Sequence, residues 1–233
     1  MRYRAVFFDA GETLVYPHPS FPELLSLVLE REGHEVDPAT IREKVHVVAD
    51  IFTAAAAEGE LWSTSSERSR VFWDRVYRRL LGELGIGFGD GLATAIYSTF
   101  TDLSNYRAFP DAHPALNRLR EAGVALGVIS NFEEWLERLL ESLGLAEFFD
   151  VRVISGIEGI EKPDPKIFRL AMERAGVEPD ESAHVGDSLS FDVEPAASLG
   201  MLAVLIDRRG RYPDHAGPRI ASLDELIPLV EAS

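Results

Sequence analysis

The feature that most constrains the fold is a short apolar run that occurs five times in the chain and stops each time at a polar residue or a glycine. The runs are Ala5–Phe8, 124–129, Val151–Ile154, 183–185 and Leu202–Ile206. Runs of this kind are typical of parallel strands that are buried on both faces. Helical periodicity fills the segments between the last four runs and before the second, at 111–122, 133–143, 164–175 and 190–199. The alternation predicts an α/β fold, a Rossmann-like, doubly wound parallel sheet with helices on both faces.

The segment between the first and second runs has a different character. Its apolar residues follow helical rather than strand spacing, which predicts four helices, at 22–31, 38–58, 66–84 and 92–103. An insertion of this length predicts a second domain, seated above the strand ends where α/β sheets bind their ligands. We therefore expect an α/β core formed by residues 1–16 and 107–233, and an inserted helical domain formed by residues 17–106.

Composition excludes several classes of function. The chain has 23 Lys and Arg against 39 Asp and Glu, a net charge of −16, which repels nucleic acid and anionic membranes. It has no cysteine, which excludes thiolate nucleophiles and cysteine metal sites, and none of its six histidines is paired at zinc-ligand spacing. The first apolar run is too short for a signal peptide, and no run has transmembrane length. We expect a cytoplasmic protein with a small-molecule substrate and no nucleic-acid or membrane partner, as a monomer or a homodimer.

Polar side chains follow three of the predicted strands at the point where each strand ends. They are Asp9, Ser130 and Asp187, and parallel strands bring such ends to one edge of the sheet. To these we add Lys162, in the segment Glu-Lys-Pro-Asp-Pro at 161–165, and Asp192, five residues after Asp187. Alone, each of these residues is equally typical of a turn, a helix cap or a surface loop. Together they supply carboxylates for a hard cation, a carboxylate nucleophile, a hydroxyl and an ammonium, the groups that phosphoryl transfer through an aspartyl phosphate requires.

In chain order, the segments that carry these residues read Phe-Asp-Ala-Gly-Glu-Thr-Leu at 8–14, Ile-Ser-Asn at 129–131, Lys-Pro-Asp at 162–164 and Gly-Asp-Ser at 186–188, followed by Asp192. They resemble the four motifs of the haloacid dehalogenase-like hydrolase superfamily. The helical insertion after the first motif resembles the α-helical (C1-type) cap of one of its subclasses. The resemblance covers nearly the whole chain.

The resemblance implies a role for each motif residue. Asp9 would be the nucleophile that attacks phosphorus and would also bind Mg²⁺ through its other oxygen. The backbone carbonyl of Gly11 and the carboxylate of Asp187 would be further Mg²⁺ ligands. Asp192 would either bind the ion directly or hold the groups that bind it. The residues that would contact the substrate are Ser130, Asn131, Phe132 and Lys162, and Lys162 would also offset the charge of Asp9.

One position departs from the family pattern. Phosphatases of the family usually carry, two residues after the nucleophile, an aspartate that serves as general acid and base, and here that residue is Gly11. Losing a positioned acid or base typically lowers a rate by about 10²–10⁴-fold. The favoured interpretation is a Mg²⁺-dependent phosphatase acting on a small phosphate monoester, with Glu12, a residue of the cap or no residue replacing the acid.

Three alternatives remain open. A 2-haloacid dehalogenase needs no acid, because its leaving group is a halide, although the intact Asp187 and Asp192 favour Mg²⁺ and phosphate. A phosphonate hydrolase would use a cap lysine, here Lys44, which fits an exposed helix face better. A non-catalytic member would retain the metal site and only bind a ligand.

Two further features lie outside the motifs. The segment after the last strand holds Arg208, Arg209 and Arg211, which suggests either an anion-binding segment or a solvated loop, and we favour the solvated loop. His184 lies inside a predicted buried strand, and we expect it to be a hydrogen-bonded core residue.

Overall fold

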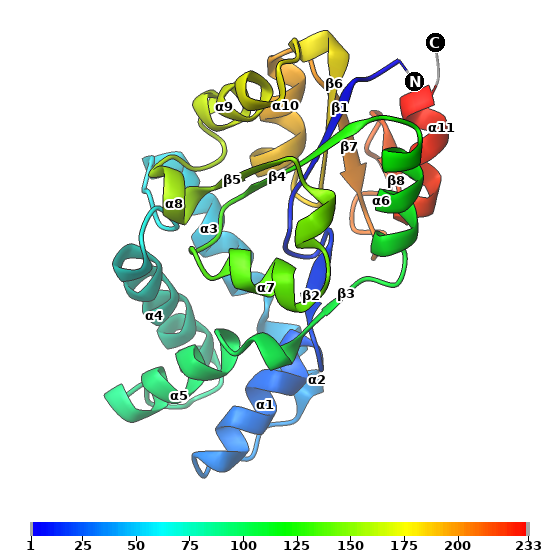
Figure 1. Cartoon of the computed structure of the whole chain (residues 1–233). Coiled ribbons are helices and arrows are strands. Elements are labelled where there is room, and N and C mark those ends of the chain that lie inside the picture. Colours follow the sequence, from blue (N-terminus) through cyan, green and yellow to red (C-terminus); the bar gives the residue numbers. More distant parts are fainter. Residues whose placement is uncertain (1, 232–233) are drawn as a thin grey trace. The chain divides into compact units, whose positions relative to one another are not determined.

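The computed structural model describes residues 2–231, and its centre is a parallel six-stranded sheet (Figure 1). In spatial order the strands are β5 (Val151–Ile154), β4 (Ala125–Ser130), β1 (Ala5–Phe8), β6 (Ser182–Gly186), β7 (Leu202–Ile206) and β8 (Arg219–Ile220). All five pairings are parallel. The five predicted strands are confirmed within one residue at each end, and β8, only two residues long, was not predicted.

Strand β1 lies in the middle of the sheet, paired with β4 on one side and β6 on the other. Phe7 of β1 lies opposite Gly127 of β4, and a Cβ atom at Gly127 would overlap the Phe7 ring, so the glycine makes room for the aromatic side chain. Because β1 is central, the residue that follows it, Asp9, lies between the ends of β4 and β6.

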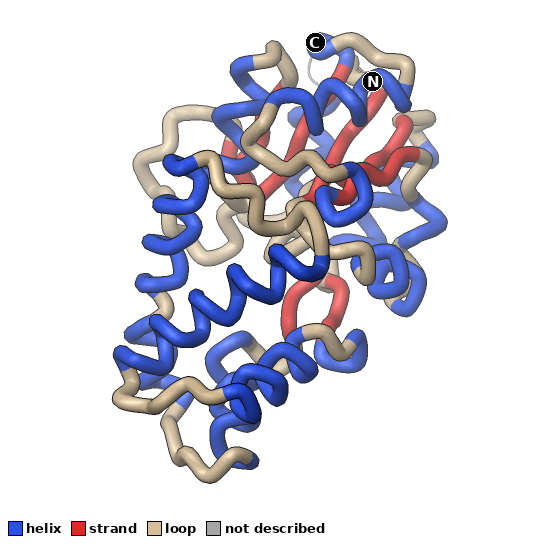
Figure 2. Tube along the Cα trace, turned by 90° about the vertical axis from the view of Figure 1, so that its left-hand side faces the viewer, coloured by secondary structure: helices blue, strands red, loops and turns tan. Residues whose placement is uncertain are grey.

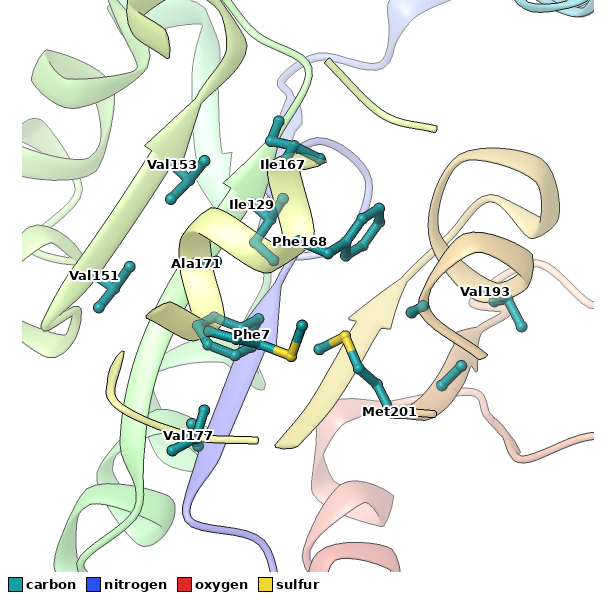
Figure 3. Close-up of a cluster of buried hydrophobic side chains, with 14 of the residues drawn as sticks. Phe7, Ile129, Val151, Val153, Ile167, Phe168, Ala171, Val177, Val193 and Met201 are labelled. Atoms are coloured by element: carbon teal, nitrogen blue, oxygen red, sulfur yellow. The ribbon is translucent and has the colours of Figure 1, made fainter. Parts of the chain in front are cut away.

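Helices cover both faces of the sheet, as predicted for a doubly wound fold (Figure 1). The bounds of the helices in this part of the chain are α6 (Ala112–Glu121), α7 (Leu136–Ser142), α8 (Ser155–Glu158), α9 (Pro165–Ala175), α10 (Glu194–Ser198) and α11 (Leu226–Glu231). Figure 3 shows the core on one face, where Phe7 and Ile129 of the sheet pack against Ile167 and Phe168 of α9.

The helix predicted at 190–199 begins differently from the prediction. Residues Leu189–Val193 form a wider π-helical turn, and only Glu194–Ser198 are α-helical. The side chain of Ser188 caps the turn by accepting a hydrogen bond from the Phe191 N–H. A π-helical turn changes the direction of the side chains relative to an α-helix and is frequent at functional sites. In this turn Asp192 is buried.

The chain divides into two compact units, one formed by residues up to Tyr16 and from Ala108 onward, the other by Pro17–Arg107. The second unit is helical (Figure 2). Its helices are α1 (Phe21–Arg31), α2 (Pro38–Lys44), α3 (His46–Glu58), α4 (Ser66–Glu83) and α5 (Asp90–Phe100). The prediction of a single helix at 38–58 is therefore wrong, because the helix is interrupted at Val45 and two helices form in its place. Their core contains Leu25, Leu80 and Ile96, all fully buried.

Two short strands that were not predicted, β2 (Val15–Pro17) and β3 (Tyr106–Ala108), pair with each other. They belong to the two chain segments that join the units. Three-residue strands carry too few residues for their alternation to be recognised in a sequence. Among residues 2–231, no helix combines the length and the apolar character needed to span a membrane.

Candidate active site

The site is organised around Asp9, which follows β1 and is 8% exposed. Its backbone N–H donates to the carbonyl of Val185 in β6, at 2.9 Å, which fixes the start of the loop. Its carboxylate oxygen Oδ1 accepts hydrogen bonds from Ser130 Oγ at 3.1 Å and from Lys162 Nζ at 2.7 Å. The structure thus brings together two residues predicted at the ends of separate strands, Asp9 and Ser130, and a lysine predicted in a loop.

Lys162 is almost completely buried and lies between two carboxylates. Its Nζ atom is 2.7 Å from Asp9 Oδ1 and 2.6 Å from Asp192 Oδ1. Burial opposes the positive charge, but the carboxylates of Asp192 and Asp9 outweigh it and raise the pKa of Lys162 above its ordinary value. Lys162 therefore carries a fixed positive charge in the middle of an acidic cluster.

Asn131 holds the backbone of Lys162. Its side-chain Oδ1 accepts from the Lys162 N–H at 2.7 Å, and its Nδ2 donates to the Lys162 carbonyl at 2.8 Å. This pair of hydrogen bonds links the end of β4 to the segment before α9, 31 positions away. Asn131 therefore sets the position of the Lys162 backbone, and its contact with a substrate stays a prediction.

Asp192 connects Lys162 to the sheet. Its Oδ1 also accepts from His184 Nε2 of β6 at 3.0 Å, and its Oδ2 accepts from the Ser188 N–H at 3.1 Å. Burial alone would raise the pKa of Asp192, but Lys162 and His184 outweigh it and hold the pKa well below its usual range. His184 is buried and hydrogen-bonded, as expected, but its contact with the acidic cluster was not predicted.

The third carboxylate of the cluster belongs to Asp187, directly after β6. Asp9, Asp187 and Asp192 each place one carboxylate oxygen within 4.8 Å of the others. Burial, followed by the negative charges of Asp9 and Asp192, raises the pKa of Asp187 to about 7. Burial is also the largest cause of the raised pKa of Asp9, and Lys162 only partly offsets it. Carboxylate oxygens are ligands that hard divalent cations prefer, so these three residues fit the predicted metal site.

Two arginines of the loop after β7 contact the acidic residues of this region. Arg211 Nη2 lies 2.9 Å from Asp187 Oδ2, and Arg209 Nη2 lies 2.6 Å from Glu12 Oε2. Glu12 has a backbone φ of 56°, a left-handed conformation that is uncommon outside glycine. The sequence predicted this arginine-rich segment as a solvated loop. It is a loop, but Arg209 and Arg211 contact residues that follow β1 and β6, and Arg208 pairs with Asp111 just before α6. The local sequence did not reveal these partners.

Two remaining candidates have simpler surroundings. Gly11 is half-buried, and a Cβ atom built there would meet no atom within 4 Å. Phe132 donates its N–H to Ser155 Oγ at 2.9 Å, and its ring lies edge-on to Trp135 with the centroids 4.6 Å apart. Contact of Phe132 with a substrate, and ligation of a metal by the Gly11 carbonyl, stay predictions.

The comparisons with known proteins agree with this geometry. A family model described as haloacid dehalogenase-like hydrolase matches residues 3–200. The chain is 38% identical over 249 residues to a phosphoserine phosphatase of Thermus thermophilus, covering 98% of this chain and 99% of the relative. It is 33% identical over 219 residues to a glyceraldehyde 3-phosphate phosphatase of Methanopyrus kandleri, covering 91% and 86%. The crystal structure of a HAD phosphatase from Thermococcus onnurineus superposes with a TM-score of 0.64 at 26% identity, covering 99% of both chains.

Proposed function

Because the chain belongs to the haloacid dehalogenase-like hydrolase family, we propose that it is a Mg²⁺-dependent phosphatase that hydrolyses a small phosphate monoester through an aspartyl phosphate. The observation that carries the proposal is the buried contact of Asp9 with Ser130 and Lys162 beside the carboxylates of Asp187 and Asp192. The two phosphatases that match nearly the whole chain support the same reaction class.

In the proposed reaction, one carboxylate oxygen of Asp9 attacks phosphorus and the bond between phosphorus and the ester oxygen breaks. The ester oxygen departs with the bonding electron pair and takes up a proton from solvent water, because position 11 has no acid to supply one, and Asp9 carries the phosphoryl group as an acyl phosphate. A water molecule then attacks phosphorus and gives up a proton to solvent, the bond to Asp9 breaks, and inorganic phosphate is released with the carboxylate regenerated. Two displacements at one atom replace a single difficult attack by water.

Lys162 and Ser130 make the first displacement electrostatically possible. An anionic nucleophile and an anionic phosphate repel each other, and the buried ammonium of Lys162 offsets this repulsion at 2.7 Å from Asp9. Ser130 Oγ donates to the same oxygen of Asp9, and in the proposed reaction it would turn its one O–H to a phosphoryl oxygen of the substrate. Asn131 and Asp192 hold Lys162 in this place and act through it.

The cation would be held by Asp9 and Asp187, with the Gly11 carbonyl as the third protein ligand that the family pattern implies. Both oxygens of Asp192 already accept hydrogen bonds from protein groups, which supports a positioning role for this residue. When bound, Mg²⁺ supplies positive charge that neutralises the carboxylates and stabilises the charge of the transferring phosphoryl group.

Gly11 leaves position 11 without a proton donor, so the enzyme should cleave esters of acidic alcohols faster than esters of ordinary alcohols. A halide leaving group needs no proton, so a glycine at position 11 is also compatible with a 2-haloacid dehalogenase, which is the second candidate. Glu12 is the nearest carboxyl in the sequence, and its side chain pairs with Arg209.

Phosphate release from a panel of small esters, one with an activated aryl leaving group, tests the proposal. It should require Mg²⁺ and should disappear in Asp9→Asn, whereas Asp214→Asn, at an exposed aspartate, should retain it. Halide release from 2-chloropropionate without phosphate release would instead establish the dehalogenase. If the folded protein releases neither phosphate nor halide, the remaining interpretation is a non-catalytic binding protein.

A further inference from the structure

The loop after β7 places two positive charges beside the proposed active site. Arg211 contacts Asp187 and Arg209 contacts Glu12, each through one Nη2 atom. Their side chains are 49% and 64% exposed. Among the described residues, the remaining guanidinium nitrogens of both arginines have no hydrogen-bond acceptor, and they are available to a ligand.

The backbone at Arg211 is fixed by a buried carboxylate. Asp207, 4% exposed, accepts hydrogen bonds from the N–H groups of Arg211 at 2.7 Å and Tyr212 at 2.9 Å. Arg219 donates to the same carboxylate at 3.3 Å. A surface arginine on an unconstrained chain would have no defined direction, whereas this loop directs Arg211 toward Asp187.

If the substrate carries an anionic group besides its phosphate, the site needs a positively charged side chain to bind that group. Lys162 is already engaged by Asp9 and Asp192, and its side chain is almost completely buried. Glu12 and Asp187 add further negative charge at the edge of the cluster, and the chain as a whole carries −16. Without another cation, a substrate carboxylate would meet only repulsion.

Arg211 and Arg209 already bind carboxylates in this structure, those of Asp187 and Glu12. A guanidinium matches the planar geometry of a carboxylate and can bind both of its oxygens. Asp187 is one of the proposed metal ligands, and a cation bound there would replace Arg211 as its counter-ion. The guanidinium would then be free to accept a carboxylate from the substrate in place of that of Asp187.

We propose that Arg211, with Arg209 beside it, binds a carboxylate of the substrate, so that the natural substrate is a small phosphate monoester that also carries a carboxylate. This inference rests on the proposed phosphatase function and narrows its substrate class. It separates phosphorylated amino and hydroxy acids from phosphorylated alcohols and aldehydes, which have no anionic group besides the phosphate.

The test compares esters that differ only in the carboxylate. O-phosphoserine is paired with O-phosphoethanolamine, and 3-phosphoglycerate with glycerol 3-phosphate, at saturating Mg²⁺. We expect kcat/KM to favour the carboxylate member of each pair by about tenfold to a hundredfold, the usual range for a hydrogen bond to a charged group. Arg211→Gln should reduce this ratio toward one, mainly through KM, and Arg209→Gln should reduce it less.

Arg4→Gln is the matched control, because Arg4 forms a similarly exposed ion pair with Glu181 in the same unit and lies outside the site. It should leave the ratio unchanged. Equilibrium binding to Asp9→Asn gives a readout that needs no turnover. O-phosphoserine should bind this variant more tightly than O-phosphoethanolamine, and adding Arg211→Gln should remove the difference.

The outcomes separate this inference from the proposed function. If wild type hydrolyses both members of each pair equally, or if Arg211→Gln keeps the preference, the phosphatase stands and the role of Arg211 is overturned. If no ester is hydrolysed and none binds Asp9→Asn, both proposals fail. A stronger preference for a bisphosphate than for any carboxylate ester would also overturn the assignment, since the second group would then be a phosphate.

Discussion

The ammonium of Lys162 lies 2.7 Å from a carboxylate oxygen of Asp9, although the two residues are 153 positions apart in the chain. The same ammonium reaches Asp192, so one buried cation joins the loops after β1, before α9 and after β6. Lys162 thereby links the segment before α9 to two loops that already lie beside each other, because β1 and β6 are paired. The ion pairs therefore serve the stability of this end of the sheet as well as the proposed chemistry.

Replacing Lys162 with methionine should both destabilise the protein and abolish phosphate release. Methionine is unbranched and only one atom shorter than lysine, but it leaves two buried carboxylates without their partner, a change that typically costs about 3–5 kcal/mol. The proposed attack by Asp9 would also lose the charge that offsets its repulsion from phosphate. Urea unfolding gives the stability change, and phosphate release from the aryl ester gives the activity.

Lys166→Met is the control for that variant, since Lys166 lies four residues further on and its side chain is 72% exposed in a contact with Asp164. Exposed pairs of this kind contribute about 0–1 kcal/mol, so the control should unfold close to wild type and remain active. Equal stability of Lys162→Met and wild type would show that the buried pairs contribute nothing net.

The position of Lys162 shows what sequence reasoning can reach. An apolar run that ends at a polar residue marks both a buried strand and the edge where the strand stops, so Asp9, Ser130 and Asp187 could be assigned to one edge of the sheet. Lys162 has no such signal around it. The resemblance to a family motif points to it, and in the structure it lies between the buried carboxylates of Asp9 and Asp192.

The contacts of His184 and Arg211 could not be predicted in the same way. His184 reaches Asp192 because a π-helical turn replaces the expected α-helix, and nothing in the local apolar pattern distinguishes these turns. Arg211 reaches Asp187 from a loop 24 positions away, and its direction depends on Asp207. Partners of this kind are set by tertiary packing, so a local pattern shows the charge of such a loop but not its target.

Metal binding should strengthen with pH through the titration of Asp187. Burial and neighbouring carboxylates raise its pKa to about 7, from 3.8, in the metal-free protein. Between these values the folded protein holds a proton that the unfolded chain has lost, so the stability of the metal-free protein should fall as pH rises. A cation binds the deprotonated carboxylate and should reverse this trend.

Thermal unfolding with and without Mg²⁺ from pH 4.5 to pH 8 checks this. The stabilisation by Mg²⁺ should be small at the acidic end and should grow until the pH passes about 7. Asp187→Asn, which cannot titrate, should show little stabilisation by Mg²⁺ at any pH. Stabilisation of wild type by Mg²⁺ that does not vary with pH would place the ion away from Asp187.

Gly186→Ala should disturb the site without changing any charge. A Cβ atom at this last residue of β6 would overlap the carboxyl group of Asp192, so Asp192 would have to leave its contacts with Lys162 and His184. Overpacking of a buried position typically costs about 1–3 kcal/mol. Urea unfolding should show this loss together with reduced phosphate release. Gly82→Ala is the control, because a Cβ there meets nothing within 4 Å and alanine favours the helix.

Gly11→Asp should restore the missing proton donor. Position 11 has room for a side chain and does not have a left-handed backbone, so aspartate should fit without strain. A carboxylic acid two residues after the nucleophile would protonate a leaving alcohol, which matters only where the alcohol is a poor leaving group. We expect kcat for alkyl phosphates to rise by up to about 10²–10⁴-fold, the usual contribution of a general acid, with little change for the activated aryl ester.

Gly11→Asn distinguishes the effect of an acidic group at position 11 from the effect of a larger side chain, because asparagine has nearly the shape of aspartate and no acidic proton. It should leave the ratio of alkyl to aryl ester hydrolysis at the wild-type value. An equal gain on both kinds of ester in Gly11→Asp would indicate a change in metal binding rather than acid catalysis. No gain on alkyl esters, with Mg²⁺ binding intact, would mean that another group already protonates the leaving oxygen. In that case Glu12→Gln should selectively slow the alkyl esters if Glu12 is the donor, and an unchanged rate would exclude Glu12.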